Sequence, residues 1–303
     1  MTLFSIVLAL ILEQFRPLPQ QRFVLAPLTG CAQFLEERFN DGQPGHGKIA
    51  WLVAIVPAVS VALLLQVLLA WLQPLLALAL GIAVLYMTMG FRQFSHYFTD
   101  IHLALRMGEL ARARTLLGEW QGRSADRLSS QEVARLAIEQ ALVDSHRHVF
   151  APLFGFVLLG PAGALLYRLA LFFGTRWSEA GFGAFGAFSR RALAVIDWLP
   201  LRVSAASFAI VGDFEDAVYC WRTQAARWPD QSTGILLASG AGALGVRLGQ
   251  PLNDPGGMAD RPELGLGEEA DVDFMQSMIG LVWRTLVLCL LLLALLWVAS
   301  WVG

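Results

Sequence analysis

Long apolar runs alternate with charged segments along this chain. A long apolar block is divided at Gln73-Pro74 into candidate helices over 50–72 and 74–90, because proline removes a backbone donor and clashes with the preceding turn. Residues 278–302 form the clearest apolar run of all. About 20 apolar residues cross the hydrocarbon core of a bilayer as a helix, so these runs predict transmembrane helices.

Three further apolar runs extend the pattern. Residues 2–12 are too short to span a bilayer as a regular helix, and no small-residue cleavage site follows them, so we interpret them as an uncleaved N-terminal membrane helix. Residues 149–173 predict one more span. Residues 194–212 are interrupted by charged side chains and predict a segment that either crosses the membrane or lies in its interface.

The composition agrees with an integral membrane protein. The chain is 56% hydrophobic and 15% charged, against about 25% charge in an average soluble domain. The formal net charge is −2 and no basic tract is present, so we expect no nucleic-acid partner. The three cysteines are isolated, which argues against a zinc or redox motif, and we predict no metal site in the protein itself. The expected fold class is an all-α, polytopic integral membrane protein.

The segment over residues 91–148 carries eight arginines. Loops rich in arginine usually lie on the cytoplasmic side of a membrane, which favours that side for this segment. Residues 108–120 have the spacing of an amphipathic helix, and Ser129-x-x-Glu132 is a capping box ahead of a second helix. We therefore expect a helical cytoplasmic loop in a multi-pass protein of the bacterial inner membrane. The predicted organisation is N-terminal membrane helices (1–90), this loop (91–148), central membrane helices (149–212), a cytoplasmic segment (213–277) and a C-terminal membrane helix (278–303).

Ionisable residues gather where the second loop helix enters the apolar run at 149. Ionisable groups at membrane depth are costly and often functional, which makes this entrance a candidate site. On an α-helix, Glu139 and His146 share one face, and Asp144 lies one turn from His148. Such a pair could hold a metal or act in acid/base chemistry, although no third ligand is near in the sequence. The candidate residues at the entrance are Glu139, Asp144, His146, Arg147 and His148.

Each candidate also has a structural interpretation. His146, Arg147 and His148 could lie at the level of the lipid headgroups, where cationic and amphipathic groups are favourable. Arg168 follows the apolar run and could mark the far membrane edge. Asp197 and Arg202 flank a Trp-Leu-Pro segment and could form a structural ion pair there.

Five blocks, in order, carry a family resemblance: APLF with GPAGALLYR (151–168), DWLPLRVSA (197–205), GDFEDAVYCWR (212–222), ASGAGALGVRLGQP (238–251) and RPELGLGE (261–268). They resemble the CobD/CbiB family of cobalamin-biosynthesis membrane proteins, the adenosylcobinamide-phosphate synthases. GALGVRLGQP is the most specific piece. The chain departs from the family's acidic pattern: Glu139 matches the first acid of the central motif, whereas Val143 and Arg147 stand where further acids are expected. Leu193 and Ala194 stand in place of paired aspartates.

The resemblance implies an enzyme that forms an amide bond between adenosylcobyric acid and an aminopropanol or its phosphate. ATP and Mg²⁺ would be the cofactors, and the lipid bilayer and a corrinoid the partners. Glu139 and Asp144 would be catalytic, positioning Mg²⁺–ATP or acting as a base. The missing acids raise the prospect that this activity is lost. The arginines would bind phosphate or corrinoid carboxylates, because a planar guanidinium group suits such anions. The predicted substrate-binding residues are His146, Arg147, His148, Arg168, Asp197 and Arg202.

A second hypothesis comes from the N-terminus. MTLFSIVLALILEQF and the arginine-containing approach to APLF resemble AmpE, a membrane protein tied to β-lactamase regulation. In this interpretation the chain is a non-enzymatic membrane sensor, and the His-Arg-His cluster organises a cytoplasmic interface with a protein partner. The missing acids favour the sensor, and the retained GALGVRLGQP block favours the enzyme.

Overall fold

The computed structural model describes residues 2–16, 18–252 and 261–302. The chain forms two compact units, each built from two stretches of sequence. The first unit combines Met1–Gly90 with Arg147–Pro200, and the second combines Phe91–His146 with Leu201–Gly303. The five predicted segments concern membrane topology and remain a prediction.

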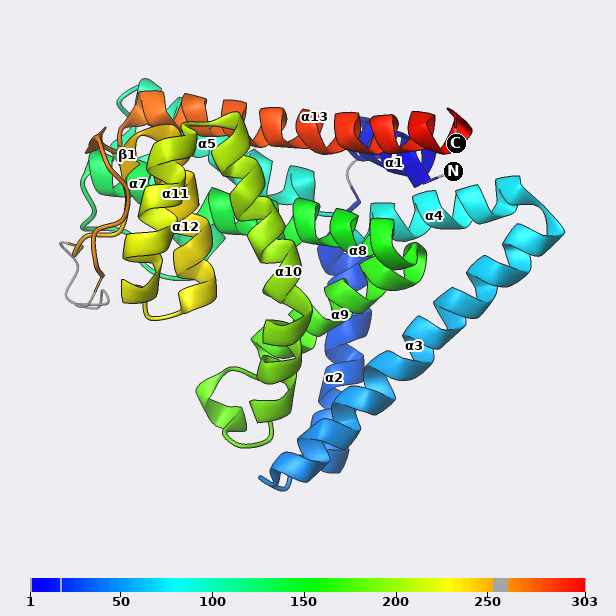
Figure 1. The fold of residues 1–303 in the computed structure, drawn as a ribbon. Helices are drawn as coiled ribbons and strands as arrows, with labels where there is room; N and C mark the ends of the chain where they lie inside the picture. Colours follow the sequence, from blue (N-terminus) through cyan, green and yellow to red (C-terminus); the bar gives the residue numbers. More distant parts are fainter. Residues whose placement is uncertain (1, 17, 253–260, 303) are drawn as a thin grey trace. The chain divides into compact units, whose positions relative to one another are not determined.

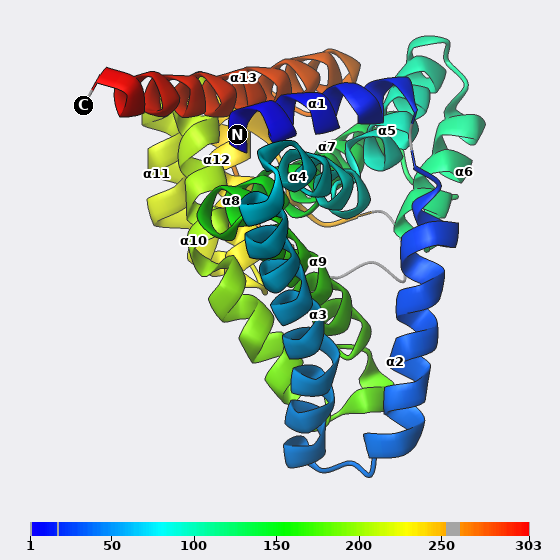
Figure 2. The same ribbon diagram turned by 90° about the vertical axis from the view of Figure 1, so that its right-hand side faces the viewer.

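The N-terminal half of the first unit confirms the predicted break in the long apolar block. Gln73 has an extended backbone (φ −160°, ψ 122°), and Pro74 opens the next helix, where its missing N–H costs nothing. Figure 1 shows α3 and α4 meeting at this sharp bend, and Figure 2 shows the short loop that joins α2 to α3. The elements are α1 (Thr2–Phe15), a π-helical turn (Gln21–Leu25), α2 (Ala26–Phe39), α3 (Pro44–Leu72) and α4 (Pro74–Thr88).

The predicted span over residues 149–173 is wrong as a continuous helix. The run divides into α8 (Ala151–Leu159) and α9 (Pro161–Arg176), which pack against each other. Gly160 has φ 62° and ψ −149°, a conformation essentially confined to glycine, and the proline after it begins α9. The chain therefore turns back inside the apolar run, which returns the far end of that run to its entrance.

The α8–α9 contact depends on two glycines. A Cβ atom at Gly163 would lie 2.0 Å from the carbonyl oxygen of Gly155, so the helices could not keep their present approach. We expect Gly163→Ala to destabilise the protein by about 1–3 kcal/mol, the usual cost of overpacking, measured as a lower thermal unfolding midpoint in detergent. Gly181→Ala is the control, because nothing lies within 4 Å of a Cβ there. An unchanged midpoint for Gly163→Ala would contradict this packing.

The remainder of the first unit surrounds an aromatic core in which Trp177, Phe173 and Phe185 are fully buried. A single 3₁₀ turn (Ala180–Phe182) leads into α10 (Ala187–Val211). This helix begins before the predicted residue 194 and continues through Pro200 into the second unit.

The second unit is organised around α7, whose residues are mostly buried. The predicted capping box is confirmed: the Ser129 hydroxyl accepts from the Glu132 N–H (3.2 Å), and the Glu132 carboxylate accepts from the Ser129 N–H (2.7 Å). Helices α5, α6, α12 and α13 pack against α7. The elements are α5 (Phe91–Arg106), α6 (Leu110–Gln121), α7 (Ser130–Ser145), a π-helical turn (His146–Phe150) that crosses into the first unit, α11 (Phe214–Gln224), a 3₁₀ turn (Ala225–Arg227), α12 (Gln231–Leu244), β1 (Val246–Arg247), β2 (Glu268–Glu269) and α13 (Val272–Val302).

Three described helices are long and apolar enough to cross a membrane: α3, α10 and α13, the last counted over Val272–Ala299. The only strands in the described residues are β1 and β2, a two-residue parallel pair. The predicted fold class, an all-α polytopic membrane protein, is confirmed.

Candidate functional site

Glu139 lies at the centre of a buried polar cluster in the second unit. One carboxylate oxygen accepts from the Gly249 N–H (2.8 Å), and the other accepts from the Arg261 guanidinium (2.5 Å). The two charged side chains are only 8% and 7% exposed. A buried carboxylate needs such partners, since desolvation otherwise makes its charge costly.

The backbone around Gly249 is shaped to reach this carboxylate. Gly249 has φ 74°, and Gln250 is the only non-glycine residue with positive φ in the described part of the chain (φ 64°). A Cβ atom at Gly249 would lie 2.0 Å from the Pro262 carbonyl oxygen. Glycine is therefore required where the segments on either side of residues 253–260 approach each other.

Arg135 fixes the same region from one turn earlier on α7. Its guanidinium donates to the Gln250 side-chain oxygen (2.7 Å) and to the Pro251 carbonyl (3.3 Å). Burial lowers the pKa of Arg135, the Glu139 carboxylate opposes that change, and the Arg261 charge adds to it. Helix α7 thus holds the GALGVRLGQP and RPELGLGE blocks through one arginine and one glutamate.

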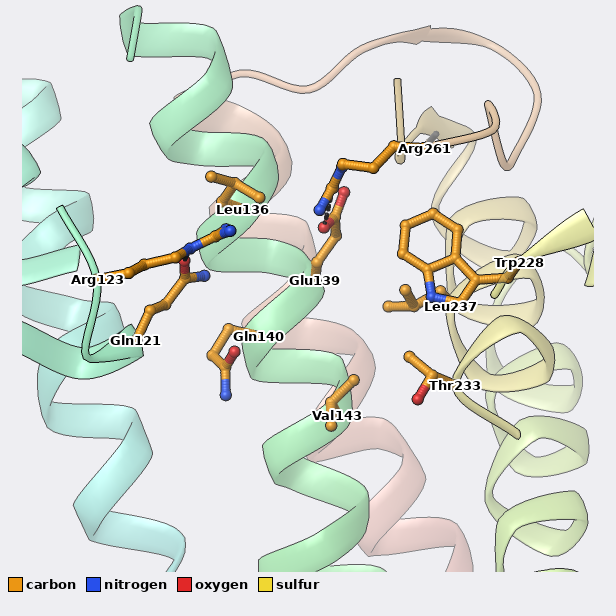
Figure 3. A pocket seen from close by; sticks show the side chains of 10 residues that line it. All are labelled: Gln121, Arg123, Leu136, Glu139, Gln140, Val143, Trp228, Thr233, Leu237 and Arg261. Atoms are coloured by element: carbon orange, nitrogen blue, oxygen red, sulfur yellow. Dashed lines mark hydrogen bonds and ion pairs between the residues drawn. The ribbon is translucent and has the colours of Figure 1, made fainter. Parts of the chain in front are cut away.

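A cavity of about 230 Å³ opens beside the Glu139–Arg261 pair (Figure 3). Arg261 stacks over the Trp228 ring, 5.3 Å from its centroid. Arg123 extends toward α7 from the loop after α6, and its Nε donates to the Gln121 side-chain oxygen (2.7 Å). Gln140 and Thr233 add polar groups, and the apolar wall is formed by Leu136, Val143, Leu237 and Trp228. The arrangement suits a ligand with both apolar and anionic parts.

A second polar cluster lies in the first unit around Arg168. Its guanidinium bonds to His148 Nδ1 (2.8 Å) and donates to the Gln20 side-chain oxygen (2.8 Å). Because arginine can only donate, His148 Nδ1 is the acceptor. The Gln20 amide in turn donates to the Met89 carbonyl. Arg168 is 5% exposed, so other side chains of the first unit surround it, and its position relative to a membrane edge remains a prediction.

Asp144 and His146, two further residues predicted for the site, form hydrogen bonds with other side chains. Asp144 accepts from Trp120 Nε1 and from the Gln140 amide, both at 3.0 Å. His146 Nδ1 lies 2.9 Å from the Ser204 hydroxyl and is buried. The proposed Asp144–His148 pairing assumed α-helical spacing, whereas a π-helical turn begins at His146.

In the first unit, the Tyr167 hydroxyl donates to Asp197 (3.0 Å), the residue expected to pair with Arg202. Arg147 and Arg202 are both partly buried. The predicted residues therefore fall into two sets: Glu139, Asp144, His146 and Arg202 in the second unit, and Arg147, His148, Arg168 and Asp197 in the first. Their use in one reaction remains a prediction.

Several cluster residues were not predicted from the sequence. Arg261 is the first residue of the RPELGLGE block. The family resemblance includes this block but gives Arg261 no role. Gln20, Arg135, Arg123 and Trp228 stand in no motif that we recognised. Their positions become visible only through contacts between residues far apart in the chain, such as Gln20 with Arg168.

Comparison with known proteins agrees with these blocks. The profile of the CobD/Cbib protein family matches residues 6–299. The chain is 33% identical to the "Cobalamin biosynthesis protein CobD" of Stutzerimonas stutzeri, over 95% of this chain and 96% of that protein. It is 33% identical to the protein of the same name from Chromobacterium violaceum, over 86% and 85% of the two chains.

A more distant relative, the "Cobalamin biosynthesis protein CbiB" of Salmonella typhimurium, is 26% identical over 82% of this chain and 81% of its own. No solved structure matches the chain. The family match covers most of both units described above and includes the three helices that are long and apolar enough to cross a membrane. The chain belongs to the CobD/CbiB family of cobalamin-biosynthesis proteins.

Proposed function

We propose that this protein forms the amide bond between adenosylcobyric acid and an aminopropanol or its phosphate, as a multi-pass protein of the bacterial inner membrane. The observation that carries the proposal is the Glu139–Arg261 pair at the wall of the cavity. Segments that resemble the family build this pair, and the printed names of the relatives support cobalamin biosynthesis rather than an AmpE-like sensor.

The cavity offers groups that such a reaction needs. Amide formation joins a carboxyl carbon to an amine nitrogen, so the amine must lose a proton and one carboxyl oxygen must leave, which it would do on a phosphoryl group supplied by ATP. Glu139 is the carboxylate in the cavity wall and would accept the amine proton as a general base. Arg123 and Arg261 would hold anionic groups, because a planar guanidinium donates two parallel hydrogen bonds to a carboxylate or phosphate.

ATP and Mg²⁺ enter the proposal through the family resemblance. The side chains do not fit a metal held by the protein: in residues 2–16, 18–252 and 261–302, no three His, Cys, Asp or Glu side chains gather as a candidate metal site. Glu139 is engaged by Arg261, and Asp144 by Trp120 and Gln140. We therefore derive no step through a protein-bound Mg²⁺.

Complementation tests the proposed activity. In a bacterium that lacks its own CobD/CbiB protein, we expect this chain to restore growth that depends on cobalamin synthesis. Glu139→Gln should lower product formation in membranes by about 100-fold or more, the usual scale for a lost general base. Glu119→Gln, an exposed position on α6, is the matched control. Failure of the wild-type chain to restore cobalamin synthesis, despite normal amounts in the membrane, would overturn the proposal.

A further inference from the structure

The polar segments before α8 and after α12 bond to each other within the second unit. The Arg135 guanidinium on α7 donates to the Gln250 side-chain oxygen (2.7 Å), and the Glu139 carboxylate accepts from the Gly249 N–H (2.8 Å). Segments joined in this way lie on the same side of a bilayer. The chain between α7 and Gly249 therefore crosses the membrane an even number of times or does not cross it.

One helix of this stretch is long enough to cross a membrane alone. In residues 140–248, all of which the structure describes, α8 has 9 residues, α9 has 16, α11 has 11, α12 has 14 and α10 has 25. About 20 residues span the hydrocarbon core. Helices α8 and α9 do not add up to one span, because the chain reverses between them at Gly160. A single crossing by α10 would separate Arg135 from Gln250, so the even number is zero.

The hairpin of α8 and α9 nevertheless has a surface suited to lipid. No charged side chain occurs between Val149 and Tyr167. Just before the turn, Val157, Leu158 and Leu159 are 39%, 60% and 54% exposed. At about 1.5 Å per residue, α8 is about 14 Å long, roughly half of the hydrocarbon core. The hairpin is therefore long enough to enter the bilayer and too short to cross it.

The backbone of the turn has the bonds that it needs in an apolar medium. The Gly160 N–H donates to the Phe156 carbonyl (2.8 Å), and the Gly163 N–H donates to the Gly160 carbonyl (3.0 Å). The turn lies against α3, because a Cβ atom at Gly160 would be 2.4 Å from Gln66 Nε2. Gln66 lies within the apolar part of α3, which is long enough to cross a membrane. Irregular backbone is tolerated at membrane depth where it is covered by protein in this way.

Helix α10 has the features of a helix that lies along a membrane surface. Val195, Trp198 and Leu199 are exposed and share one face, since they are three and four residues apart. Arg190 and Arg191 are exposed near its start. A helix with an apolar face and basic residues lies in the membrane interface, where tryptophan is also enriched.

We propose that residues 146–212 do not cross the membrane. Helices α8 and α9 form a re-entrant hairpin whose tip, residues 157–159, lies among lipid acyl chains, and α10 lies along the surface from which the hairpin enters. His148 and Arg168, which bond to each other at the base of the hairpin, are then reached from the side of the membrane that holds Glu139. This inference does not depend on the proposed function.

The distribution of basic residues agrees with this topology. Residues 91–148 carry eight arginines, and arginine-rich loops lie on the cytoplasmic side. The segment between α9 and the first turn of α10 is basic as well, and without a crossing it lies on that same side. Lys48 at the start of α3 accompanies it, because its Nζ lies over the Phe188 ring, 5.8 Å from the centroid. The basic residues of that segment are Arg176, Arg190 and Arg191.

Cysteine labelling in sealed membrane vesicles of both orientations tests the proposal on the full-length chain. The parent and blank is Cys31→Ser, because Cys31 is exposed, whereas Cys220 is buried and Cys289 lies within α13. Gly181→Cys reports on the segment after α9, where nothing lies within 4 Å of a Cβ, and Ser124→Cys reports on the exposed loop after α6. We expect a membrane-impermeant maleimide to label both variants from the same side, at least tenfold faster than from the other side.

Two further variants complete the test. Gln73→Cys, at the exposed bend after α3, is the control for the opposite side of the membrane. Leu158→Cys, labelled with a fluorophore and reconstituted into vesicles, reports on the tip of the hairpin. After subtraction of the signal of the labelled parent, we expect lipids brominated on their acyl chains to quench this fluorophore at least twofold more than aqueous iodide does. A fluorophore at Ser124→Cys should show the reverse order.

Two results would overturn the proposal. Labelling of Gly181→Cys and Ser124→Cys from opposite sides would mean that the chain crosses the membrane within α8 and α9. Quenching of the Leu158→Cys fluorophore by iodide and not by brominated acyl chains would mean that the hairpin lies in water. Complementation reports on the amide synthesis alone, so the topology and the proposed activity succeed or fail separately.

Discussion

Arg261→Met is expected to destabilise the protein by about 3–5 kcal/mol, the usual cost of removing one partner of a buried ion pair. The Glu139 carboxylate is 8% exposed and would keep the Gly249 N–H while losing its cation. The variant would also lose the stacking of the guanidinium on Trp228. A large fall in the thermal unfolding midpoint of the detergent-solubilised protein, relative to wild type, is the measurement.

A double variant distinguishes the effect of leaving the buried Glu139 carboxylate without its cation from the effect of losing the contacts of Arg261. Glu139→Leu together with Arg261→Met removes both charges, and replacing a buried pair by apolar groups is often neutral or stabilising. We expect this double variant to unfold at a higher temperature than Arg261→Met alone. Arg112→Met serves as the control, because its pair with Glu109 is exposed and such pairs contribute about 0–1 kcal/mol. Purely additive losses in the double variant would contradict the ion-pair explanation.

Proline follows a helix break at two places in the apolar runs, and the sequence analysis predicts only one of the two breaks. At Gln73-Pro74 the proline stands between two runs that are each long enough to be helices, so the break was evident. At Gly160-Pro161 the proline lies inside one run of spanning length, and the length of that run predicts a continuous helix. The observed turn requires a glycine with positive φ, and its neighbours Gly155 and Gly163 allow the two halves to pack closely.

The sequence predicts one candidate site, whereas the residues predicted for it lie in two units of the structure. Glu139 was selected for its place at a membrane entrance, and it does line a cavity. Its partner Arg261 lies 122 positions away, and no helical or strand periodicity relates residues at that separation. His148 was assigned to Asp144 by α-helical spacing, but the π-helical turn from His146 changes that register.

The chain reverses at Gly160, and Arg168 on the following helix α9 links several segments of the first unit. Its guanidinium holds His148 and Gln20 at the same time, and Gln20 also bonds to the Met89 carbonyl. The Gly90 N–H donates to the His148 carbonyl (3.1 Å). One arginine therefore ties α9 to the segment before α2 and to the π-helical turn before α8, and through Gln20 to the end of α4.

Arg168→Lys is expected to destabilise the first unit although it conserves the charge. A lysine ammonium is a compact donor on a flexible stem and does not reproduce the planar fork that reaches two acceptors at once. A buried acceptor that loses its donor costs about 1–3 kcal/mol, and the Gln20 side-chain oxygen is such an acceptor, so a clear fall in the thermal midpoint should follow. Arg191→Lys, at an exposed position on α10, should leave the midpoint unchanged. If Arg168→Lys is as stable as wild type but fails in complementation, the guanidinium serves ligand binding rather than the fold, and the structural role argued from its bonds to His148 and Gln20 is wrong.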